Sequence, residues 1–169
     1  YAVKYDLPVM YVTEDTTRAD PETLTKLFTT AINAGAKRIC VCDTVGHATP
    51  IGVYYLMKFV HDLVEKIDPT IKIDWHGHCD RGLAIPNTMA AIAQGAHRVH
   101  ATALGIGERV GNTAMDLLLI NLNLEGISTR NLTRLAEYCR LVSEACNVPV
   151  PPNYPVMGRD AYRTSTGVH

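Results

Sequence analysis

A short pattern occurs twice in the chain and limits the folds that the chain can adopt. Residues 31–39 read AINAGAKRI and residues 91–99 read AIAQGAHRV. In each copy an alanine-rich helical pattern ends at a glycine, Gly35 or Gly95, and a β-branched strand pattern follows. This order is typical of a helix that ends in a left-handed residue before a strand. A further helix and strand separate the copies, so the repeating unit is one strand and one helix, about thirty residues in all.

Four such units can be placed along the chain. The predicted strands lie near Pro8 to Val12, Arg38 to Asp43, Ile71 to His78 and Arg98 to Ala103, and a helix follows each strand. Strictly alternating units imply a parallel sheet, and the pattern fits both a doubly wound sheet and a (β/α)₈ barrel. A barrel needs about eight units and roughly 250 residues, so these units would make half of one.

The chain is expected to contain a barrel half followed by an arm. After a helix predicted at about Asn131 to Cys146, four prolines within residues 148–155 exclude a regular helix. We therefore expect residues 148–169 to be a proline-rich linker or an arm. The first residue is not methionine, which is typical of a piece of a longer protein, and four units alone would leave two open sheet edges.

The composition favours a globular domain that binds a small molecule. The 169 residues are 47% hydrophobic and 20% charged, with a formal net charge of -1. No run of basic residues suits nucleic acid or anionic lipid, and no apolar run reaches the roughly 18 residues of a membrane span, so neither partner is expected. The five cysteines lack C-x-x-C spacing, which favours reduced thiols and a cytoplasmic location.

Polar segments follow all four predicted strands, where ligands bind in sheets of this kind. They read TEDTTR from Thr13, DTVGHATP from Asp43, HGHCD from His76 and ALGIGERVGN from Ala103. In the third strand, alternation places Asp74, His76 and His78 on one face. The two imidazoles are then roughly 6 to 7 Å apart and can close onto one cation. The alternative is that both are hydrogen-bonded residues lining the sheet. A zinc finger is excluded, because no second ligand pair has the required spacing.

Two loops allow a structural and a functional interpretation. The loop GIGERVGN, from Gly105 to Asn112, has glycines at i, i+2 and i+6. The dinucleotide fingerprint has them at i, i+2 and i+5, and Glu108 would repel a pyrophosphate, so a Rossmann site is rejected. The alternative is a tight turn before a helix starting near Asn112. In EDTTRADPE, Asp20 is a typical helix N-cap, whereas Glu14 and Asp15 have no evident structural role.

Together, the segments TEDTTRADPE, CDTVGHATP, HGHCDRG, GIGERVGN and STGVH resemble the second half of the catalytic region of 2-isopropylmalate synthase and its relatives. That family includes citramalate synthase, homocitrate synthase and hydroxymethylglutaryl-CoA lyase. The resemblance covers nearly the whole chain, and the GERVGN loop is similar to that of the synthases. The chain departs from the family in having Cys79 where H-x-H-N-D has asparagine. It also lacks the first-strand aspartate that binds the metal in the family.

The resemblance implies a TIM barrel, with residues 1–147 as the C-terminal half of the catalytic barrel and residues 148–169 as a linker or the start of a post-barrel subdomain. It also assigns roles to particular residues. It implies that His76, His78 and Asn112 bind a divalent cation, which the ligand types allow to be Zn²⁺, Mn²⁺ or Mg²⁺. Glu14 is then the carboxylate that assists proton transfer, and Thr44 the hydroxyl that contacts the carboxylate of the substrate. The remaining assignments are Glu108 and Arg109, which shape the metal and acyl-CoA surroundings, and His169, a catalytic histidine that is often supplied by the partner subunit.

The activity implied by the resemblance is a metal-dependent Claisen condensation of acetyl-CoA with a 2-oxo acid. A reaction with 2-oxoisovalerate in branched-chain amino-acid biosynthesis is favoured, and citramalate or homocitrate synthesis is the nearest alternative. A non-catalytic half-barrel that binds a metal or metabolite is an alternative from another class. We expect a homodimer or pairing with the missing half of the barrel, and no activity from these residues alone.

Overall fold

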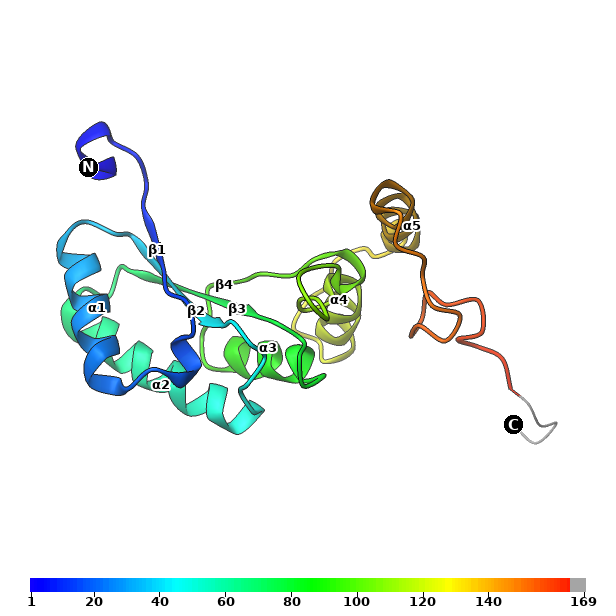
Figure 1. The fold of residues 1–169 in the computed structure, drawn as a ribbon, viewed down its shortest axis with the longest axis horizontal. Helices are drawn as coiled ribbons and strands as arrows, with labels where there is room; N and C mark the ends of the chain where they lie inside the picture. Colours follow the sequence, from blue (N-terminus) through cyan, green and yellow to red (C-terminus); the bar gives the residue numbers. More distant parts are fainter. Residues whose placement is uncertain (165–169) are drawn as a thin grey trace.

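The computed structural model describes residues 1–164 and contains one four-stranded parallel sheet in the order β1-β2-β3-β4 (Figure 1). The strands are β1 (Met10–Val12), β2 (Arg38–Asp43), β3 (Lys72–Gly77) and β4 (Arg98–Val99). The α-helices are α1 (Pro21–Asn33), α2 (Pro50–Ile67), α3 (Ala84–Ala93), α4 (Met115–Leu124) and α5 (Leu135–Cys146). Short 3-10 helices are η1 (Ala2–Tyr5), η2 (Thr16–Arg18) and η3 (Ala103–Gly105). The predicted alternation of strands and helices is confirmed.

The repeated helix ends have the same geometry. Gly35 has a φ of 100° and Gly95 a φ of 82°, the left-handed region that favours glycine. One residue later, the amide of Ala36 donates to the carbonyl of Ala31, and the amide of Ala96 donates to that of Ala91, both at 3.0 Å. These bonds close the helix and direct the chain into the next strand, which confirms the unit inferred from the sequence.

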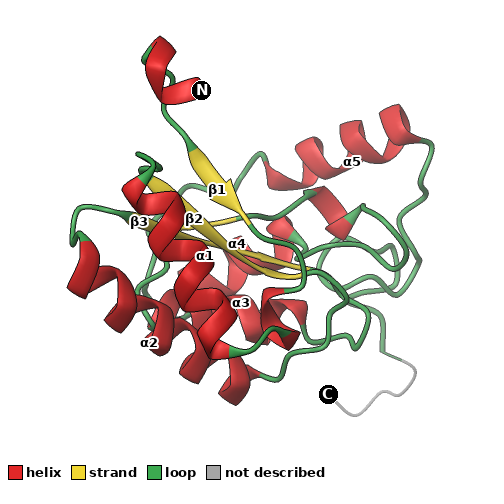
Figure 2. Cartoon of the chain, turned by 60° about the vertical axis from the view of Figure 1, so that its left-hand side comes forward, coloured by secondary structure: helices red, strands yellow, loops and turns green. Residues whose placement is uncertain are grey.

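Helices α1, α2 and α3 cover one face of the sheet, and the hydrophobic core lies between them (Figure 2). Alternate residues of β2 and β3 face this layer, among them Ile39, Val41 and Trp75, all of them fully buried. In α1, the buried Phe28 packs edge-on against Tyr11 of β1, with ring centroids 6.4 Å apart. The predicted cap at Asp20 is also confirmed, since its side chain accepts from the amide of Thr23, and Thr49 caps α2 in the same way by accepting from the amide of Gly52.

The opposite face of the sheet is polar. Asp74 of β3 is completely buried there and pairs with Arg38 of β2, while Arg98 lies 3.8 Å and His100 lies 3.5 Å from its second oxygen. The buried carboxylate of Asp74 is therefore paired with positively charged side chains, as a buried charge requires. His76, one alternate position further along β3, continues this face toward the carboxyl end of the sheet.

Some element boundaries differ from the sequence predictions. β4 contains two residues rather than the six expected, because residues 112–114 return beside it and bond the backbone that would have extended the strand. The amide of Thr113 donates to the carbonyl of Gly77, and the amide of Thr102 donates to the carbonyl of Thr113. For the same reason α4 begins at Met115 rather than near Asn112.

The described sheet is open. β1 pairs with β2, and β4 pairs with β3, so within residues 1–164 each outer strand has one unpaired edge. After α5 the described chain forms turns and no helix, as the prolines predict. No helix of the described residues is long and apolar enough to span a membrane.

Candidate functional site

A hollow of about 420 Å³ lies at the carboxyl end of the sheet, where the chain leaves three of the strands. It is lined by Val12, Thr13, Glu14, Cys42, Thr44, His76, His78, Gly107, Glu108 and Asn112. The structure thus brings together most of the residues that the sequence singled out, from segments far apart along the chain. Arg109 lies outside the lining, and His169 lies outside the described residues.

The two histidines converge as predicted. Nε2 of His76 and Nε2 of His78 are 3.2 Å apart, and the rings are nearly perpendicular. Burial lowers the pKa of His76, and the neighbouring His78 and His100 lower it further. A neutral imidazole keeps a nitrogen lone pair that can bind a metal. Nδ1 of His78 is buried without a partner among the described residues. The alternative, in which both imidazoles are hydrogen-bonded lining residues, stays open, because their Nε2 atoms contact each other and Asn112.

Asn112 reaches the histidines because the loop before it is rich in glycine. Its side-chain amide nitrogen is 3.5 Å from Nε2 of His78, and turning the amide would present its oxygen instead. The backbone amide of Asn112 donates to the carbonyl of Gly105 at 2.9 Å. A Cβ at Gly107 would collide with Oδ1 of Asn112. Glycine at position 107 is therefore required for this placement of the amide.

The donor set fits a divalent cation. Two imidazole nitrogens and one amide group meet at the wall of a hollow, and such a nitrogen and oxygen set leaves positions open for substrate. Within the described residues no cluster of three or more His, Cys, Asp or Glu side chains could hold a metal, and the predicted third donor of this site is the amide of Asn112. Metal ligation by these residues stays a prediction.

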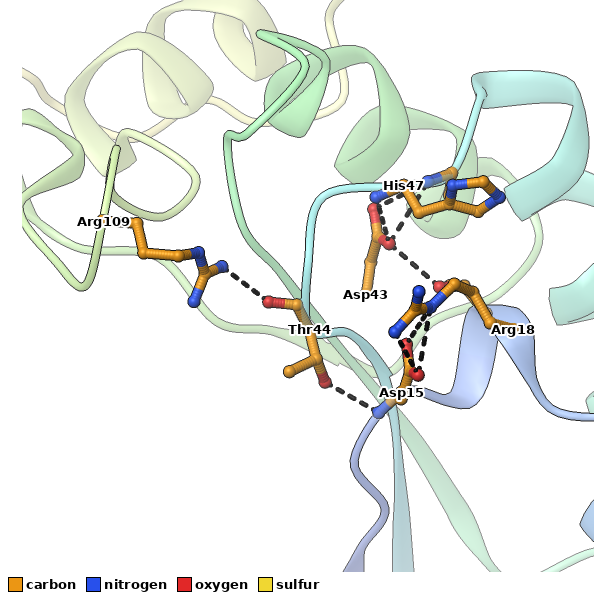
Figure 3. A network of polar contacts seen from close by, with 8 residues as sticks. Asp15, Arg18, Asp43, Thr44, His47 and Arg109 are labelled. Carbon is orange, nitrogen blue, oxygen red and sulfur yellow. Dashed lines mark hydrogen bonds and ion pairs between the residues drawn. The ribbon is translucent and has the colours of Figure 1, made fainter.

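Glu14 stands on a tightly bonded turn after β1. The hydroxyl of Thr16 accepts from the amide of Cys42 at 2.9 Å and lies 2.6 Å from the hydroxyl of Thr13. Asp15 has a φ of 55°, and its amide donates to Oγ1 of Thr44 at 2.8 Å (Figure 3). The sequence left Asp15 without a structural role, and the structure shows that its backbone connects β1 to β2. Oγ1 of Thr44 accepts this bond and keeps a proton to donate.

Arg109 connects two loops through its hydrogen bonds. Its guanidinium donates to both carboxylate oxygens of Asp80, at 2.7 and 2.9 Å, and to the carbonyl of Thr44 at 2.7 Å. The Arg109 guanidinium holds the pKa of Asp80 below its usual value. The guanidinium is thus directed at protein groups rather than into the hollow, and it ties the GERVGN loop to the ends of β2 and β3. Its predicted effect on the metal and acyl-CoA surroundings stays a prediction.

Asp43 is a residue whose role the sequence did not reveal. It is fully buried at the end of β2 and accepts from the hydroxyl of Thr17 and from the amides of His47 and Ala48. These bonds fix the loop between Thr44 and the start of α2 (Figure 3). An aspartate followed by a turn and a glycine was a signal for this role, because carboxylates commonly bond backbone amides in such turns.

Comparison with known proteins assigns the chain to a family. The family model described as HMGL-like matches residues 1–142. The chain belongs to the HMGL-like family. Its most similar curated relatives include the 2-isopropylmalate synthase of Pyrococcus abyssi, 37% identical over 174 residues that cover 100% of this chain and 36% of the relative. The (R)-citramalate synthase of Methanocaldococcus jannaschii is 38% identical over 171 residues, which cover 100% of this chain and 34% of that protein.

Solved structures agree with the fold of this HMGL-like chain. The hydroxymethylglutaryl-CoA lyase of Pseudomonas aeruginosa superposes with a TM-score of 0.77 at 18% identity, covering 94% of this chain and 55% of that one. The HMG-CoA lyase of Bacillus subtilis gives a TM-score of 0.75 at 22% identity, covering 89% and 53%. These lyases are TIM barrels, so the open sheet corresponds to part of a barrel, as predicted. The HMGL-like chain spans about a third of the length of the curated relatives it matches.

Proposed function

We propose that this chain forms the second half of the catalytic barrel of an acyltransferase that condenses acetyl-CoA with a 2-oxo acid. The observation that carries the proposal is the single hollow lined by Glu14, Thr44, His76, His78 and Asn112. The synthases among the curated relatives support this reaction class. We infer 2-oxoisovalerate as the oxo acid and a role in leucine biosynthesis, with location in the cytoplasm, where the free cysteines stay reduced.

In the proposed condensation, each residue of the hollow has a separate role. The hydroxyl of Thr44 donates a hydrogen bond to the carboxylate of the oxo acid. The amide of Asp15 and the guanidinium of Arg109 hold Oγ1 and the carbonyl of Thr44 in place. Glu14 assists removal of a methyl proton from acetyl-CoA, so that the resulting carbon nucleophile attacks the keto carbon. His76, His78 and Asn112 would hold a divalent cation, which supplies a Lewis acid that polarises the keto group. Hydrolysis of the thioester then releases CoA.

The substrate class can be tested by measuring the thiol released from acetyl-CoA. The assay uses this chain together with the rest of the barrel, because these residues alone are not expected to be active. It is run with pyruvate, 2-oxoisovalerate and 2-oxoglutarate in turn, with Mn²⁺ or Zn²⁺ present and then chelated. We expect chelator-sensitive release with 2-oxoisovalerate. Preference for pyruvate or for 2-oxoglutarate would assign citramalate or homocitrate synthesis instead.

A matched pair of variants tests the role of Glu14 in the same assay. Glu14→Gln removes the carboxylate that we assign to proton transfer, and we expect thiol release to fall by about 10²- to 10⁴-fold. Glu22→Gln on the exposed surface of α1 is the control and should keep full activity. Equal activity of both variants would contradict the assignment of Glu14.

The open sheet favours one alternative from another class. Within the described residues both outer strands have unpaired edges, so this chain could act as a non-catalytic half-barrel that binds metal. Stoichiometric metal binding by this chain, with no thiol release from any of the three oxo acids when the rest of the barrel is present, would support that alternative.

A further inference from the structure

Asp116, at the start of α4, receives hydrogen bonds from two distant parts of the chain. It is completely buried. Its Oδ1 accepts from the backbone amide of Leu104 at 2.7 Å, and its Oδ2 accepts from the hydroxyl of Tyr154 at 3.0 Å. The carboxylate thus joins the loop after β4 to the segment that follows α5. A buried carboxylate is costly unless its oxygens are bonded, so both donors matter to its placement.

The Leu104 side of this contact leads to the candidate site. Leu104 has a φ of 57°, a left-handed conformation that is strained for leucine, and the bond to Asp116 helps to hold it. The next residue, Gly105, accepts the backbone amide of Asn112 through its carbonyl at 2.9 Å. The amide of Gly105 donates to the carbonyl of Thr102. Fixing Leu104 therefore fixes the start of the loop that ends at Asn112.

The Tyr154 side is presented by a compact turn. The amide of Tyr154 donates to the carbonyl of Pro151, the amide of Gly158 to that of Tyr154, and the amide of Asp160 to that of Pro152, at 2.9 to 3.0 Å. A Cβ at Gly158 would lie 2.5 Å from the carbonyl oxygen of Pro152. The turn is therefore closed by its own bonds.

The contact between this turn and the GERVGN loop is loosely packed. A hollow of about 300 Å³ separates the loop from residues 148–154. The hydrogen bond from Tyr154 to Asp116 lies beside this hollow and joins the two sides. Burial raises the pKa of the Tyr154 hydroxyl, and the charge of Asp116 raises it further, so the hydroxyl remains a donor.

We propose that Tyr154 is a positioning residue that holds the Leu104–Asn112 loop, through Asp116, in the conformation that presents the side chain of Asn112 to the two histidines. This inference rests on the proposed function, because it takes Asn112 to be a ligand of that site. Through Tyr154, the segment after the barrel then helps to position the site, although Tyr154 does not line the hollow. The chemistry lost on removing the hydroxyl is a hydrogen bond to a charged acceptor.

The test compares Tyr154→Phe with Tyr162→Phe in the full chain. Both variants remove one hydroxyl from the same segment, but Tyr162 is 80% exposed and lies outside the contact between Asp116 and Tyr154. The first readout is hydrogen exchange of the amides of Leu104, Gly105 and Asn112 without metal. The second is Mn²⁺ affinity, followed by the electron paramagnetic resonance of bound Mn²⁺. Both are measured where circular dichroism shows each variant folded.

We expect Tyr154→Phe to speed exchange in the loop and to weaken Mn²⁺ affinity by about three- to tenfold, the size of the net contribution of an ordinary hydrogen bond. Tyr162→Phe should match the unchanged protein in both readouts. Unchanged exchange in Tyr154→Phe would overturn the proposal, as would faster exchange with unchanged affinity. If the unchanged protein binds no Mn²⁺, Zn²⁺ or Mg²⁺, the proposed metal site fails, and the exchange measurement alone decides whether Tyr154 holds the loop.

Discussion

At the scale of single residues, the candidate site depends on the glycine at position 107 as well as on the predicted ligands. Asn112 can approach His78 because Gly107 has no Cβ to meet its amide oxygen. The φ of Gly107 is not in the left-handed region, so the requirement is for space rather than for an unusual backbone conformation. The identity of position 107 is therefore tied to the placement of a ligand.

Gly107→Ala should displace the Asn112 side chain while leaving the fold intact, because the clash involves one side chain in an exposed loop. We expect Mn²⁺ affinity to fall by at least about tenfold, as is usual when a metal site loses its geometry. Isothermal titration measures this directly. Val110→Ala, in the same loop at an exposed position, is the control, and equal affinities for both variants would be inconsistent with the steric role of Gly107.

At the scale of elements, a histidine helps to register β3 against the helix end before β4. Nδ1 of His97 accepts the backbone amide of Ile73 at 3.1 Å, and its ring stacks on His61. Burial lowers the pKa of His97, and the charges of Lys72, His61 and Arg38 lower it further, against an opposing effect of Asp74. The neutral ring is the form that can accept the bond.

This contact predicts a pH dependence of stability. Because the folded state lowers the pKa of His97, the unfolded chain binds more protons as the pH falls below the ordinary value of about 6.5. The contribution of His97 is therefore present above that pH and is lost as the pH falls through the lowered value. Urea unfolding at pH 7.5 and 5.5 measures the loss. We expect a smaller loss in His97→Gln than in the control His47→Gln, and identical losses would refute the assignment.

The sequence predicted the strand and helix units well because their signals are local. The glycine stops at Gly35 and Gly95 and the cap at Asp20 act within one turn of chain. The convergence of His76 and His78 follows from strand alternation alone. Three features were not predictable in this way: the short β4, the hydrogen bonds from Arg109 to Asp80, and the hydrogen bond from Tyr154 to Asp116. They join residues distant along the chain, and their partners carry no periodic signal.

At the scale of the whole molecule, the open sheet exposes two parallel strand edges that a closed barrel would pair. Val12 in β1 is 51% exposed at one of these edges. Unpaired edges of this kind associate with other strands unless charges oppose the approach. We therefore propose that this segment pairs with the rest of a barrel or with a second copy of itself.

A polypeptide of these 169 residues should associate in solution, and Val12→Lys should weaken that association because a charge is costly inside a paired edge. Sedimentation velocity reports the oligomeric state. Ile51→Lys, at an exposed position on the helical layer, is the control and should associate as the unchanged chain does. A clean monomer at micromolar concentration for all three would count against edge pairing.

The central claim is that the carboxyl end of the sheet holds a divalent cation through His76, His78 and Asn112. The most direct measurement is isothermal titration of the full chain with Mn²⁺ and Zn²⁺, comparing His78→Ala with His47→Ala, whose imidazole lies outside the hollow. We expect one cation per chain, with binding unchanged in His47→Ala and lost in His78→Ala. Binding that survives in His78→Ala, or that is absent from the unchanged chain, would contradict the account.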